Sequence, residues 1–170
     1  MSGELAKLKM QLERCQAHAR FLNESLEAMA ADLPFDADAL ARYRSAPSAM
    51  AYLDQFVYRF GRLQDTMGRQ LLPLILEVVK EPLPEEATFM EKLDRLERLG
   101  IVPSVEQWDE IRELRNALTH DYPEAAERLA ATINQAVDAA RSLVAILEGN
   151  AQWLREKLPS LLRREREGKS

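Results

Sequence analysis

Apolar residues recur every three or four positions along most of this chain, which is the spacing of one face of an α-helix. The apolar positions of the first segment are Leu5, Leu8, Leu12, Cys15, Ala19, Leu22, Leu26, Met29 and Leu33. This stripe predicts one helix over about 5–33, because Pro34 follows it and cannot continue a helix.

A second long helix is expected to open near Ser48, after a short helical turn within 35–43. Its apolar face continues through Met67 and Leu71, and Pro73 then interrupts it. A proline inside a helix removes one backbone donor and clashes with the preceding turn, so the sequence predicts a kink near Pro73. The segment should end before the Pro-rich loop at 81–84.

Two capping patterns mark the next helices. Thr88 followed by Glu91 predicts a short helix that Gly100 ends. Ser104 and Gln107 repeat the pattern and open a helix whose apolar side runs from 108 to 118.

A fifth helix should begin at Pro123 and end at Gly149, and residues 150–162 can add a final one. No segment shows the alternation of a strand. The sequence therefore predicts an all-α, up-and-down bundle of four to five helices over 1–150, with a C-terminal helical extension and charged tail over 151–170.

Composition fits one domain, since 170 residues with 46% hydrophobic content can bury a core. A single cysteine, Cys15, allows no internal disulfide, and we expect it to lie in the core. His18 and His120 lie too far apart to suggest a zinc site, so we expect no metal and no cofactor. We expect His18 to lie at the surface or an edge, and Trp108 and Trp153 to be core or interface aromatics.

Charge and hydropathy narrow the functional classes. No apolar run approaches the roughly 20 residues that span a bilayer, and the N-terminus lacks the layout of a secretory signal, so we expect a cytoplasmic protein without a membrane partner. A net charge of -5 argues against coating nucleic acid through general charge. Any contact with nucleic acid should use a local cleft.

The segment 112–123 concentrates candidate chemistry at a helix end. His120 suits proton transfer near neutral pH, although a histidine at a helix end more often has a structural role. Asn116 and His120 share a helix face, whereas Arg115 and His120 diverge by about 140°. Arg115 and His120 can serve one site only if the helix loosens near Thr119 or if a second chain supplies the missing face.

The sequence Arg115-Asn-Ala-Leu-Thr-His120 resembles the R-N-x-x-x-H signature of HEPN domains. Its continuation, His120-Asp-Tyr122, resembles the H-x-Y extension of HepT-like toxins. The resemblance covers about residues 5–148, and it implies a bundle of HEPN type.

This resemblance also implies a function. HEPN toxins are homodimers whose motif-bearing helices meet in a cleft that cleaves RNA without a metal, and a nucleotidyltransferase antitoxin is the usual partner. In that case His120 acts as general base or acid, and Arg115 stabilises charge on the phosphoryl oxygens. Tyr122 matches the tyrosine to which the partner adds AMP.

Several alternatives stay open at this stage. Asn116 can orient His120 or the phosphate, or it can satisfy local backbone, while Arg112 is a candidate phosphate contact one turn earlier. Tyr122 can simply pack its ring on the bundle. The whole chain can be a non-catalytic subunit, either substrate-binding or antitoxin, that pairs with a nucleotidyltransferase, or a purely structural helical dimer. The other arginines, Arg59, Arg62 and Arg69, are expected to be solvated.

Overall fold

A computed structural model describes residues 2–81, 83–120 and 125–167, with only the backbone given for Ser2, His120 and 161–167. Helices account for most of these residues, and no strand occurs among them. The elements are α1 (Ser2–Met29), the 3₁₀ turn η1 (Ala30–Asp32), α2 (Ala37–Arg44), α3 (Pro47–Thr66), the π-helical turn η2 (Met67–Leu71), α4 (Leu72–Val78), α5 (Phe89–Arg98), α6 (Val105–His120) and α7 (Ala126–Glu167). The predicted all-α bundle is confirmed.

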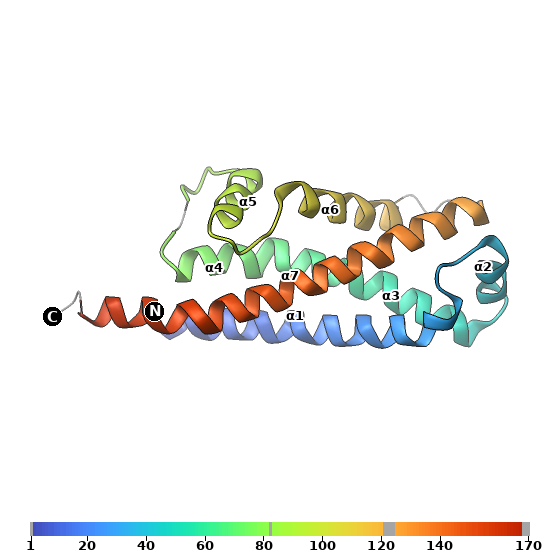
Figure 1. Cartoon of the computed structure of the whole chain (residues 1–170), viewed down its shortest axis with the longest axis horizontal. Helices are drawn as coiled ribbons and strands as arrows, with labels where there is room; N and C mark the ends of the chain where they lie inside the picture. Colours follow the sequence, from blue (N-terminus) through green and yellow to red (C-terminus); the bar gives the residue numbers. More distant parts are fainter. Residues whose placement is uncertain (1, 82, 121–124, 168–170) are drawn as a thin grey trace.

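The long helices lie side by side along one axis (Figure 1). α1 packs mainly on α3, and α6 packs on α7 and α3. The short α2 lies at one end of the bundle, where α1 connects to α3, while α5 lies towards the other end beside α4 and α6. The α3 and α6 pairing positions the candidate site.

The stripe predicted for the first helix forms its buried face. Leu8, Cys15, Leu22 and Met29 are all at most 3% exposed, so Cys15 lies in the core as expected. The regular helix ends at Met29, and one 3₁₀ turn replaces its expected last turn.

The chain from α3 to α4 stays helical across Pro73 by means of a π-helical turn. In η2 the backbone N–H of Leu72 donates to the carbonyl of Met67, five residues earlier. π-Turns of this kind insert an extra residue and often occur at functional sites. The irregularity thus lies just before Pro73, while the kink itself stays a prediction.

The longest helix departs from the sequence-based expectation. α7 does not end at Gly149 but continues to Glu167, with Pro159 inside it. Gly100 has the positive φ of 74° that favours glycine at a helix end, whereas Gly149 has no such conformation. The predicted stop at Gly149 is therefore wrong, and the division at residue 150 stays a prediction.

His18 also differs from expectation, because it is buried between α1 and α3 at 7% exposed. Its Nδ1 lies 2.9 Å from Nη1 of Arg59, and the Arg59 guanidinium lies 4.4 Å from the ring centre of Phe21. Arg59 is thus held by two side chains of α1 rather than freely solvated.

Trp108 is fully buried, as expected.

Across the described ranges, no helix is both long and apolar enough to cross a membrane.

Candidate functional site

Two glycines allow α6 to approach α3 and η2 closely. A Cβ on Gly61 would lie 3.7 Å from Nε of Arg115, and one on Gly68 would lie 3.2 Å from Cζ2 of Trp108. Gly61 and Gly68 are seven residues apart, as are Trp108 and Arg115, and the pairing order shows that the two segments run antiparallel. The glycines therefore set the depth at which Arg115 lies.

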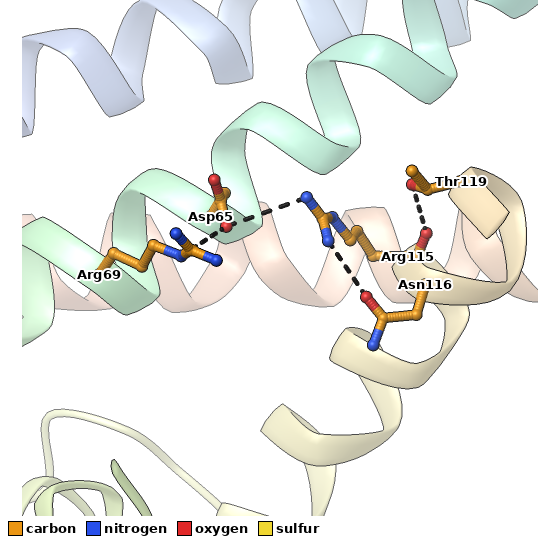
Figure 2. Close-up of polar contacts among 5 residues, drawn as sticks. All are labelled: Asp65, Arg69, Arg115, Asn116 and Thr119. Carbon is orange, nitrogen blue, oxygen red and sulfur yellow. Dashed lines mark hydrogen bonds and ion pairs between the residues drawn. The ribbon is translucent and has the colours of Figure 1, made fainter.

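Polar contacts on both sides hold Arg115 in place (Figure 2). Nη1 donates to Oδ1 of Asn116 at 3.1 Å, and Nη2 lies 3.9 Å from Oδ1 of Asp65. The same Asp65 oxygen lies 3.1 Å from Nε of Arg69. Nε of Arg115 is buried without a hydrogen-bond partner in the described structure. The guanidinium is thus oriented but keeps unused donor capacity.

A hollow of about 450 Å³ lies beside Arg115 and is called the polar groove here. It is lined by Gln64, Asp65, Gly68, Arg69, Pro73, Phe89, Lys92, Arg112, Arg115 and Asn116. Four of these side chains are cationic and one is anionic. Cations that converge from three elements suit a phosphate or another anion.

The cations of the polar groove differ in how far they are already paired. Arg112 forms an ion pair with Asp109 at 2.5 Å, and its side chain is 48% exposed. Lys92 has no ion-pair partner among the residues that the structure describes. Arg112 was a predicted phosphate contact, and its position on the groove wall is compatible with that role.

A second hollow, of about 550 Å³, lies on the other side of Arg115. Its walls carry Met50, Val57, Tyr58 and Leu118, with Tyr58 58% exposed. Arg115 therefore separates a cationic groove from a more apolar hollow.

The geometry of α6 bears on one of the two ways in which Arg115 and His120 were expected to meet, the loosening of the helix. The helix does not loosen, because residues 117–120 remain α-helical and the Thr119 hydroxyl donates to the Arg115 carbonyl at 2.9 Å. Positions 115 and 120 are thus about 140° apart around the axis. The side chain of His120 lies outside the described structure, as does the whole of Tyr122.

Asn116 makes a contact that neither expectation for it included. Its amide oxygen accepts from Arg115, so this residue helps to orient the guanidinium.

Sequence reasoning missed Gln64, Asp65, Phe89 and Lys92, because segments distant in the chain bring them together. The available signal was the seven-residue spacing of two glycines inside one helical stretch, which marks a face where a neighbouring helix approaches closely.

Within the described ranges, no three His, Cys, Asp or Glu side chains form a group that could hold a metal ion. Comparisons with known protein families, with curated proteins and with solved structures find no match to this chain.

Proposed function

We propose that this protein is a metal-independent endoribonuclease of HEPN type, acting in the cytoplasm as the toxin of a pair with a nucleotidyltransferase antitoxin. The observation that supports this proposal is the polar groove, where four cations, Arg115 among them, converge on a chain of net charge -5. A local cationic groove is the feature that an acidic protein needs to bind a polyanion.

The proposed reaction is transesterification within the RNA strand. His120 accepts the proton of a ribose 2′-hydroxyl, the 2′-oxygen bonds to the adjacent phosphorus, and the bond from phosphorus to the 5′-oxygen breaks. The leaving 5′-oxygen takes a proton, from a histidine or from water. Arg115 stabilises the negative charge that grows on the phosphoryl oxygens, and Arg112 and Asn116 support it. The products are a 2′,3′-cyclic phosphate and a 5′-hydroxyl.

A second copy of the chain has a defined part in this proposal. Because positions 115 and 120 lie about 140° apart on a straight α6, we propose that one phosphate is served by Arg115 of one protomer and His120 of the other. The dimer would form through the α6 helices. AMP on Tyr122, two residues from His120, would add bulk and negative charge near that phosphate and block RNA.

The alternative function is a non-catalytic subunit that pairs with a nucleotidyltransferase. One observation favours it: Asp65 and Asn116 already engage the Arg115 side chain, as expected of a polar surface with a purely structural role.

Cleavage of RNA by the purified protein in excess EDTA tests the proposal. We expect cyclic-phosphate products from the wild type, and at least a 100-fold loss of rate, on the order expected for such groups, in His120→Ala and in Arg115→Ala. Arg141→Ala is the matched control, because Arg141 is exposed on α7 outside the groove and forms only an ion pair with Asp138. Circular dichroism should show unchanged helix content in all three variants.

Equal activity of the wild type and His120→Ala would contradict the nuclease. If His120→Ala also retains binding to a co-expressed nucleotidyltransferase, the non-catalytic subunit is the better description.

A further inference from the structure

Gln64 is the least explained polar residue of the polar groove. It is only 6% exposed and lines the groove, and its side-chain amide makes no hydrogen bond among the described residues. Its polar atoms are not among the fully buried atoms without a partner, so the amide opens onto the groove. A carboxamide offers two donor hydrogens and an acceptor oxygen, and here these are free to bind a ligand that supplies both an acceptor and a donor.

Gly68 lets an aromatic ring lie close to that amide. The point at which a Cβ on Gly68 would lie is 3.2 Å from Cζ2 of Trp108, 3.6 Å from Cζ of Phe89 and 3.8 Å from Nε2 of Gln64, so these groups already surround it. Phe89 is partly buried against the core and also lines the groove, so part of its ring faces the groove beside the amide.

Cations line the same groove. Arg69 follows Gly68 directly and is 78% exposed, and Lys92 lies one helical turn after Phe89 on α5. Lys92 has no ion-pair partner in the described structure. The groove thus combines a hydrogen-bonding amide, an aromatic surface and positive charge.

We infer that the polar groove binds one unpaired nucleotide of a single RNA strand. Gln64 hydrogen-bonds the edge of the base, Phe89 contacts its face, and Arg69 with Lys92 holds the adjoining phosphates. Only an unpaired base presents its Watson–Crick edge and an open face together, so the site selects single-stranded RNA. This inference rests on the proposed function and names Gln64 as its specificity-determining residue.

The test is fluorescence anisotropy with labelled eight-nucleotide strands of oligo(A), oligo(C) and oligo(U), measured on the His120→Ala variant so that no strand is cleaved. We expect one base to bind at least threefold tighter than the others. Gln64→Leu, which keeps the volume and removes the hydrogen bonds, should weaken binding of that base by about 5- to 100-fold and abolish the preference. Gln135→Leu, at an exposed position on α7, should change nothing.

The phosphate contacts have a separate readout. Lys92→Ala should weaken all strands equally and reduce the slope of log affinity against log salt by about one. Lys9→Ala, an exposed lysine on α1 paired with Glu13, is the matched control. A duplex of the same sequence should bind at least tenfold more weakly than the single strand.

Three results would overturn the inference: no RNA binding by His120→Ala, equal binding of duplex and single strand, or an unchanged base preference in Gln64→Leu. Gln64→Met provides a second apolar variant if Gln64→Leu lowers the melting temperature. Base-selective binding without cleavage by the wild type would remove the proposed nuclease and keep the nucleotide site. If the wild type cleaves RNA and Gln64→Leu keeps the same base preference, the proposed nuclease stands and the nucleotide site is removed.

Discussion

Asp65 of α3 and Arg115 of α6 form an ion pair of 3.9 Å across the floor of the polar groove. Both side chains are about three-quarters buried, at 28% and 25% exposed. Asp65 is also the one carboxylate that lines the groove among the described residues. It therefore orients Arg115 and, at the same time, competes with any anion that Arg115 could bind.

Asp65→Asn separates these two effects. Loss of the negative charge should tighten binding of single-stranded RNA by about two- to fivefold at low salt, since ion pairs at this exposure contribute up to about 1 kcal/mol. Cleavage should slow, because Arg115 loses one of its anchors. Asp138→Asn, at an 84% exposed position on α7, is the control for the change in net charge. A parallel rise or fall of binding and cleavage would contradict the dual role of Asp65.

His18 should make the stability of the protein depend on pH. Burial lowers the pKa of His18 below 6.5, and the positive charges of Arg59, Arg62 and Arg14 lower it further. The unfolded chain therefore takes up the proton first as the pH falls, so the free energy of unfolding should decrease from pH 6.5 down to the lowered pKa of the folded state.

His18→Gln keeps a hydrogen-bond acceptor for Arg59 and cannot take up this proton. Between about pH 7.5 and 5.5, which spans the ordinary histidine pKa, urea unfolding should show a smaller loss of stability in this variant than in the wild type. The chain has two histidines, so both proteins should carry His120→Ala. Parallel pH profiles would show that His18 does not titrate as described.

Substitution by alanine should change the stability of the protein in opposite directions at Gly149 and at Gly100. Gly149 is exposed inside α7, and no neighbouring side chain lies within 4 Å of the position that a Cβ would occupy, so Gly149→Ala should stabilise the protein by about 0.5–1 kcal/mol. Gly100 has a φ of 74°, so Gly100→Ala should destabilise it by about 1 kcal/mol. Thermal unfolding of the two variants checks both signs, and a destabilised Gly149→Ala would mean that α7 ends there after all.

Thr88 caps α5 through a reciprocal pair of hydrogen bonds. Its hydroxyl accepts from the Glu91 backbone at 3.2 Å, and its own backbone N–H donates to the Glu91 carboxylate at 2.6 Å. Thr88→Ala should cost about 1 kcal/mol in the free energy of unfolding. Thr132→Ala is the control, since the Thr132 hydroxyl bonds a carbonyl within α7 and caps nothing.

The same cap predicts a pH dependence. The hydrogen bonds from Thr88 lower the pKa of Glu91, so its stabilising effect is present above the ordinary carboxyl pKa and is lost as the pH falls through the lowered value. Thr88→Ala keeps the backbone N–H that is the main cause of this shift, so the variant to use is Glu91→Ala, and the stability difference between it and the wild type should shrink in acid. A difference that is constant from about pH 7 to about pH 3, across the ordinary carboxyl pKa, would argue against the carboxylate's part in the cap.

Local patterns were sufficient to predict most of the fold. The apolar stripe of α1 and the capping box at Thr88 each depend on neighbours in the chain, and both are confirmed. The helix end predicted at Gly149 is wrong because glycine occurs both at the ends of helices and inside them. The sign of φ distinguishes these two positions, and the sequence alone does not give it. His18 was misread because its burial depends on Arg59, which is 41 residues away.

Only those residues of the candidate site that lie close together in the sequence could be predicted. Arg112, Arg115 and Asn116 lie on one helix, so the motif placed them together. The other groove residues come from α3, η2, α4 and α5, and their convergence depends on how closely the helices pack. That distance is set by Gly61 and Gly68, whose effect appears only when the opposing side chains are known.

The unbroken course of α6 has a kinetic consequence for the proposed function. If one phosphate is served by position 115 of one protomer and position 120 of the other, the specific activity of the proposed nuclease should depend on its own concentration. Below the dissociation constant of the dimer, activity per chain should rise in proportion to protein concentration, and above it activity should level off. Dilution alone would then switch the proposed activity off, and a cell would control it through the number of copies that it makes.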